Sequence, residues 1–239
     1  MTWIKASLLW SASIVLSAIP VLAQGTVSFS IGDSRPILNA PYSVVEETEH
    51  NQTLGDGTHM VIRSQTRLYR DSYGRTRKES FANRNETASN EPTTIEIHDP
   101  VAGVAYTLFV QQRVARLIAP LAKFPTNPNA VRKPPSPAQR VQPKTTSENL
   151  GAQSIEGVLV DGVRNTTVYP EGFMGNDRPI QLVHETWVSP ELGLTLQEKT
   201  TDPRFGDTIT RVTSLNRSEP DPALFQVPPD YILQDTNTK

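Results

Sequence analysis

Short runs of alternating residues, separated by tight-turn sequences, fill most of the chain and restrict it to a sheet built from local hairpins. The clearest hairpin pairs residues 42–54 with 59–71 across "GDGT", where Asp56 and Gly57 tolerate positive φ. Almost no apolar pattern has a period of 3.6, so helix should be a minor component. Further turn sequences are expected at 72–75, 99–103, 161–162 and 189–193.

The segments between these turns predict a mainly β fold of roughly ten strands, a number that flat open sheets seldom hold without curling. Because the connections are short, neighbouring strands should be antiparallel. We therefore expect a curved antiparallel sheet, a half-barrel meander with little helix. In one segment, 179–190, apolar residues occupy both faces, so something must cover the second face.

The stretch "EPDPALFQVPPDY", 219–231, packs four prolines around apolar side chains. Proline bars further sheet pairing at its own nitrogen, and Asp221 can cap one short helical turn over "PALF". Rigid flanks cost little entropy to order, so Leu224 and Phe225 should anchor against the sheet as a plug or lid. An ordinary core contact is the plainer alternative.

The N-terminus predicts export. Lys5, an apolar run and small residues at Val21 and Ala23 are typical of a signal peptide spanning 1–23. An extended segment, 24–41, and a single β-rich domain, 42–239, should follow. We expect a periplasmic or secreted protein without stable membrane insertion after cleavage, and the lack of cysteine excludes a lipid anchor on that residue type.

A Pro-rich basic insertion is expected at 120–147. The chain has seven prolines between Pro120 and Lys144, and it has no acidic residue between Val101 and Ser147. This composition favours a stiff, solvated loop, with a patch for an anionic partner as the alternative. The whole chain has 23 basic and 25 acidic residues, which argues against a nucleic-acid partner.

"ETWVSPELGL" followed by a strand and a "DPALFQVPPDY"-type segment resembles the lipoprotein-carrier (LolA-like) superfamily and related uncharacterised exported bacterial proteins. The stretches "YRDSYGRTRKE" and "IHDPVAGVAYTL" also resemble lines that recur in the latter. The resemblance implies a half-barrel of antiparallel strands, whose concave face binds acyl chains in the carriers. The carriers begin with an amphipathic helix, and 24–42 has no helical period.

Catalytic and metal-binding motifs are lacking. No nucleophile elbow, phosphate loop, dinucleotide fingerprint or zinc-protease motif occurs, so we expect no enzyme, no cofactor and no metal site. Glu47 and Glu49 share a strand face, and paired carboxylates can hydrolyse glycosides. Exposed strand carboxylates are far commoner, so a hydrolase is the weakest alternative.

The function expected from these features is that of an exported binding module, with an apolar or lipid ligand on the concave face of the sheet. The alternative is a structural or interaction protein of the cell envelope that binds no small molecule and docks an envelope protein. The residues expected to line the ligand site are Tyr106, Leu108, Val183, Trp187 and Phe225.

Overall fold

A computed structural model describes residues 36–82, 90–118 and 142–235, which all belong to one compact unit, Pro36–Lys239. The expected signal peptide and most of the 24–41 segment and of the Pro-rich insertion lie outside the described residues. No helix among the described residues is long and apolar enough to cross a membrane.

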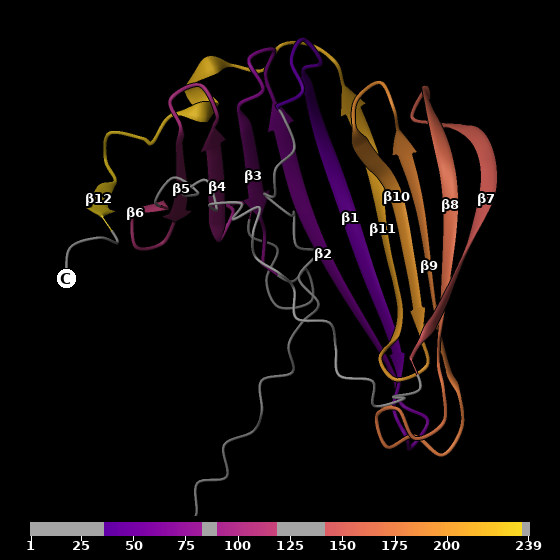
Figure 1. Ribbon diagram of the computed structural model, residues 1–239. Helices are drawn as coiled ribbons and strands as arrows, with labels where there is room; N and C mark the ends of the chain where they lie inside the picture. The colour runs from indigo at the N-terminus through magenta and orange to yellow at the C-terminus, as the bar shows by residue number, and fades with distance from the viewer. Residues whose placement is uncertain (1–35, 83–89, 119–141, 236–239) are drawn as a thin grey trace, which may run out of the picture. The chain divides into compact units, whose positions relative to one another are not determined.

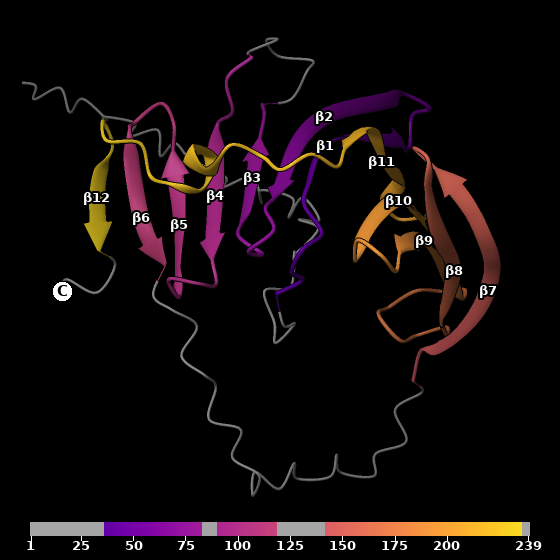
Figure 2. The same ribbon diagram turned by 90° about the horizontal axis from the view of Figure 1, so that it is seen from above.

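One twelve-stranded curved sheet contains all the described strands (Figures 1 and 2). The turn pattern predicted a curved sheet correctly, although with roughly ten strands. The only helical element in the described ranges is a 3₁₀ turn, η1 (Pro222–Phe225). The strands are β1 (Tyr42–Thr53), β2 (His59–Arg70), β3 (Thr76–Ser80), β4 (Thr94–Asp99), β5 (Val104–Phe109), β6 (Val114–Ile118), β7 (Lys144–Ile155), β8 (Val158–Tyr169), β9 (Ile180–Ser189), β10 (Leu194–Asp202), β11 (Gly206–Asn216) and β12 (Ile232–Asp235).

The strand order is β12-β6-β5-β4-β3-β2-β1-β11-β10-β9-β8-β7, so the sheet consists of two meanders joined side by side. The pairing of β1 with β11 makes that junction, between residues more than 150 positions apart. The last strand, β12, pairs with β6 in parallel, which makes the sheet mixed. A purely antiparallel meander was the expectation, and these two long-range pairings are what it missed.

The hairpin expected around Asp161 and Gly162 is wrong. The turn lies at Glu156 and Gly157, whose φ angles are 49° and 75°, and Gly162 lies inside β8. Both central residues of this turn have positive φ, as the two-residue turns that match strand twist require. Its partner strand β7 begins at Lys144, so residues 144–147, expected in the insertion, are sheet.

Two apolar clusters form the core, and the strand register places them on opposite faces of the sheet. Tyr42 and Val44 pair with Arg70 and Leu68 on one face. Following the register through β3 to β4 puts the cluster around Ile97 on the other face. The first cluster contains Tyr42, Val44, Leu68, Val158, Val160, Leu192, Leu194, Leu196 and Val212.

The β9–β10 loop helps to close the first cluster. Its Leu192 is fully buried, and the carbonyl oxygen of Leu192 accepts a hydrogen bond from Arg70 Nη2 (2.7 Å). Arg70 also donates to the carbonyl oxygen of Ala40 through Nε and Nη2, and its guanidinium lies 4.5 Å from the centre of the Tyr42 ring. One buried arginine therefore ties three chain segments together at the apolar end of this face.

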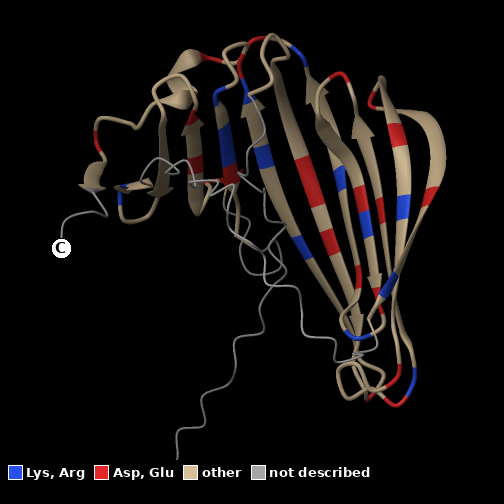
Figure 3. Cartoon of the chain, viewed as in Figure 1, with Lys and Arg blue, Asp and Glu red and all other residues tan. Residues whose placement is uncertain are grey.

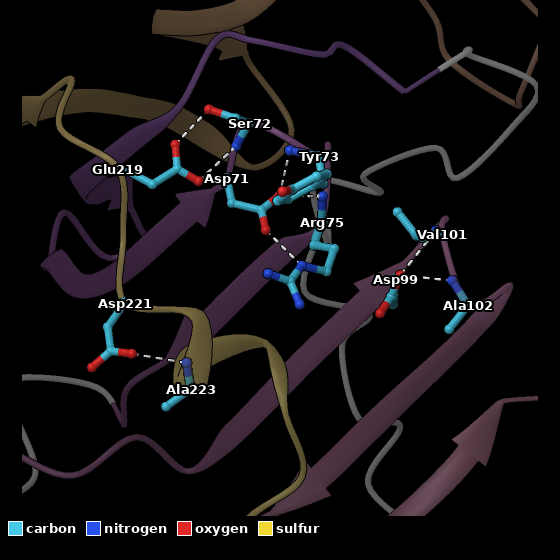
Figure 4. Close-up of polar contacts among 10 residues, drawn as sticks. All are labelled: Asp71, Ser72, Tyr73, Arg75, Asp99, Val101, Ala102, Glu219, Asp221 and Ala223. Atoms are coloured by element: carbon cyan, nitrogen blue, oxygen red, sulfur yellow. Dashed lines mark hydrogen bonds and ion pairs between the residues drawn. The ribbon is translucent and has the colours of Figure 1, made fainter.

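The C-terminal segment covers part of the opposite face, where Val227 and Tyr231 pack on the second cluster. Asp221 caps η1 by accepting from the backbone N–H of Ala223, as expected (Figure 4). The ring centre of the buried Phe225 lies 5.1 Å from the guanidinium of Arg75. The expected anchoring by this aromatic side chain is therefore confirmed as a core contact.

The turn between β2 and β3 holds the other end of that segment. Asp71 is almost fully buried and accepts from the backbone N–H groups of Tyr73 and Arg75 and from Arg75 Nε (2.5 Å) (Figure 4). Next to it, Ser72 donates to the carboxylate of Glu219 through both its backbone N–H and its hydroxyl. The "YRDSYGR" stretch is thus a structural clamp.

Candidate functional site

A row of polar side chains crosses the face that carries the first cluster, which we call the Glu46 face. Its hydroxyl and imidazole groups bond between strands: Thr48 Oγ1 lies 2.9 Å from Thr210 Oγ1, and His50 Nδ1 lies 2.9 Å from Thr208 Oγ1. The register continues the row to β9, where His184 Nδ1 lies 3.1 Å from Thr200 Oγ1. These bonds fix the side chains of a polar band across the strands.

Glu46 is the most perturbed acid of the row. Its side chain is half-buried, and burial raises the pKa of its carboxyl group to about 7. The negative charge of Glu198 raises this pKa further, and the ammonium group of Lys78 opposes both effects. Glu46 is therefore partly protonated near neutral pH, so its carboxyl group can both donate and accept hydrogen bonds.

The neighbours of Glu46 complete a small ionisable group. Lys78 on β3 and Glu198 on β10 act on its charge, and Glu198 Oε1 lies 3.7 Å from His184 Nδ1 on β9. Neither Lys78 nor Glu198 was singled out from the sequence. The sequence did contain one sign that Glu46 is partly buried: the alternation of β1 puts it on the same face as the apolar Val44.

The five residues expected to line a ligand site are not brought together. Leu108 is fully buried in the second cluster, with the partly buried Tyr106 packed against it. Trp187 packs against the first cluster, on β9, and Val183 is partly buried on the same strand. Phe225 belongs to the C-terminal segment and is buried at the end of η1. Trp187 belongs with the first cluster and Leu108 and Tyr106 with the second. The role of the five residues in ligand binding stays a prediction.

By the alternation of β1, Glu47 and Glu49 project to the face opposite Glu46. Figure 3 shows that β1 carries acidic residues beside basic residues on β2. They line a shallow hollow of about 240 Å³ with Arg63 and Arg211. Glu49 accepts hydrogen bonds from Asn51 Nδ2 (2.8 Å) and Arg63 Nε (2.7 Å), and these bonds lower the pKa of its carboxyl group. An acid held in its ionised form is poorly suited to protonating a glycosidic oxygen.

Within the described ranges, no three His, Asp or Glu side chains come close enough to hold a metal ion. A second hollow, of about 480 Å³, lies at one end of the sheet between the ends of β1 and β2 and the β10–β11 turn. Its lining mixes polar and apolar groups: Asn51, Gln52, Thr53, His59, Met60, Val61, Pro203, Arg204, Gly206 and Asp207.

No known family model and no curated protein matches the sequence. Solved structures do match, and they include a LolA superfamily protein. An uncharacterized conserved protein from Thermus thermophilus is 9% identical with a TM-score of 0.46, over 83% of this chain and 91% of that one.

Two further solved structures are similar to this chain. A MucA/MucB complex from Pseudomonas aeruginosa is 13% identical with a TM-score of 0.43, over 81% of this chain and 58% of that one. A LolA superfamily protein from Nitrosomonas europaea is 9% identical with a TM-score of 0.32, over 80% and 92%.

Proposed function

We propose that this protein is an exported binding module, periplasmic or secreted, that holds an amphiphilic, lipid-like ligand on the Glu46 face. One observation carries the proposal: the face changes from apolar to polar along a single line. The change runs from Val44 to Glu46 in β1, from Leu68 to Thr66 in β2 and from Leu196 to Glu198 in β10.

Such a line suits a ligand with an apolar and a polar part. Trp187 and Leu215 border the buried cluster and are only partly buried, so they can offer apolar contact area. On the polar side, the partly protonated Glu46 and the ammonium group of Lys78 can bind a head group through hydrogen bonds and charge. On binding, the ligand would displace solvent from these side chains.

The test uses intrinsic fluorescence. The sequence has three tryptophans, Trp3, Trp10 and Trp187, so the chain beginning at Gln24, the expected product of signal cleavage, contains Trp187 alone. We expect palmitate or a lysophospholipid, each below its critical micelle concentration, to shift the Trp187 emission to shorter wavelength, and calorimetry to show saturable heat for the same ligand.

Two variants make this experiment specific. Glu46→Ala should weaken binding about tenfold by removing the carboxyl group that donates to and accepts from the head group, whereas Glu47→Ala, one residue away on the opposite face, should bind like the parent. The proposal is wrong if neither ligand produces heat or an emission change, or if both variants weaken binding equally.

A second candidate, an interaction protein of the cell envelope, is favoured by the edge strand β7. This strand is twelve residues long and exposed along nearly all of it, with one free edge among the described strands. An extended peptide can add to such an edge. Adjacent backbone N–H groups point to opposite sides of a strand, so one of Thr146→Pro and Ser147→Pro removes an outward donor. Unchanged recovery of partners from envelope extract by both variants would count against this function.

A further inference from the structure

Three turns meet at one end of the sheet, which is the lower end in Figure 1: the β1–β2 turn, the β8–β9 loop and the β10–β11 turn. Arg204 links the last two, because its Nη1 donates to Met174 Sδ (3.2 Å) and its guanidinium lies 5.3 Å from the Tyr169 ring centre. It also lies 5.1 Å from the ring centre of Phe205. The β10–β11 turn and the ends of β1 and β2 line the 480 Å³ hollow together, so they are neighbours.

Large apolar side chains are exposed at all three turns or beside them, and we call this group the apolar tip. Phe205 is the most exposed, at 53%. Exposed large apolar side chains gathered at one end of a sheet are candidates for a binding surface. The apolar tip consists of Leu54, Met60, Val61, Phe173, Met174 and Phe205.

Three backbone donors at the apolar tip are satisfied within the chain. The N–H groups of Phe173, Met174 and Phe205 donate to the carbonyl oxygen of Pro170, to Asn176 Oδ1 and to the carbonyl oxygen of Asp202, respectively. An unsatisfied backbone group costs several kcal/mol in hydrocarbon, so internal satisfaction is the condition that lipid contact imposes. A protein partner would impose no such condition, because its own polar groups could satisfy these donors.

The charge nearest the apolar tip is also neutralised. Arg204 donates to Asp202 Oδ1 through Nε (2.8 Å) and to Oδ2 through Nη2 (2.5 Å), and these bonds lower the pKa of the Asp202 carboxyl group. The flanking turn residues carry mixed charges, with Asp56, Glu171 and Asp177 against Arg178. The surroundings lack the basic excess that anionic membranes attract.

We propose that the apolar tip docks on a zwitterionic lipid bilayer, with the side chains of the three turns entering the boundary between head groups and acyl chains. Insertion buries the exposed rings and methionine side chains, while the turns keep their internal hydrogen bonds. The strands then stand on the membrane by one end, and the line between the apolar and polar parts of the Glu46 face remains outside the bilayer.

Flotation with phosphatidylcholine vesicles tests the proposal on the chain from Gln24. The parent should float with the vesicles, and partitioning should change little between low and high salt. The Phe173→Ser, Phe205→Ser double variant should partition about tenfold less. Leu159→Ser is the matched control, because Leu159 is 64% exposed at the opposite end of β8 and should leave partitioning unchanged.

A second measurement tests whether the apolar tip is the part of the protein that contacts the bilayer. In the Phe205→Trp, Trp187→Phe double variant of the chain from Gln24, the only tryptophan stands at the apolar tip, and its emission should shift to shorter wavelength and be quenched by brominated lipid. Failure of the parent to float, equal loss in the Leu159 control, binding that needs anionic lipid and disappears with salt, or an unshifted and unquenched emission from the introduced tryptophan would each overturn the proposal.

Discussion

The indole ring of Trp187 occupies the space in which a side chain of residue 162 would stand. A Cβ atom on Gly162 would lie 2.4 Å from Trp187 Cζ3, and the two residues are direct partners across β8 and β9. Only glycine lets the ring lie flat against the neighbouring strand at this position. The Asp161-Gly162 pair therefore serves packing within a strand, although it has the composition of a turn.

Gly162→Ala should lower the free energy of unfolding by about 2 kcal/mol, because the ring must leave its place against the first cluster. Urea denaturation measures this loss, and the emission of Trp187 should shift to longer wavelength in the folded variant. Gly55→Ala is the control, since a Cβ there would meet no atom within 4 Å and its φ lies outside the left-handed region. Equal losses in the two variants would contradict the contact.

Glu46 should make stability depend on pH. Its carboxyl pKa is raised to about 7 in the folded state, so its contribution is fully present below the unfolded pKa, near 4.5, and is lost as the pH rises to about 7. Against Glu46→Gln, the parent should lose up to about 3 kcal/mol of unfolding free energy over that range. Urea denaturation at several pH values measures it. Parallel curves for the parent and Glu46→Gln would refute the shift, and Glu47→Gln should follow the parent.

Phe225 should be the main energetic anchor of the C-terminal segment, because its ring is 4% exposed and lies against Arg75. Phe225→Ala should cost about 3 kcal/mol through lost burial and the cavity left behind. Denaturant unfolding measures the effect, and Gln226→Ala, at an exposed neighbour, provides the comparison. A Phe225→Ala chain as stable as Gln226→Ala would show that the segment is dispensable for the fold.

Glu156 adopts a φ of 49° at the first central position of the β7–β8 turn, a conformation that asparagine tolerates better than glutamate. Glu156→Asn should therefore raise the free energy of unfolding by about 0.5 kcal/mol. Its partner position responds in the other direction: Gly157→Ala, at a φ of 75°, should destabilise by about 1 kcal/mol. Thermal unfolding of both variants checks the turn, and a stabilised Gly157→Ala would contradict it.

Local sequence was enough to predict the β class, the hairpin of β1 with β2 and the capped turn at Asp221, because a turn and the strands beside it are determined by neighbouring residues. The same local reasoning failed at residues 161–162. A glycine required by a ring from the next strand has the same sequence signature as a glycine required by a turn.

What only the tertiary structure decided was how the two meanders meet. The pairings of β1 with β11 and of β11 with β10 bring Glu198 near Glu46, and the segment that carries Phe225 leads into β12, which pairs in parallel with β6. These contacts join residues that are far apart in the chain. The alternation of apolar and polar residues predicts which residues share a face of a strand, but it does not predict which strand lies beside it. The burial that raises the pKa of Glu46 and the gathering of three turns at the apolar tip arise from that choice of neighbours.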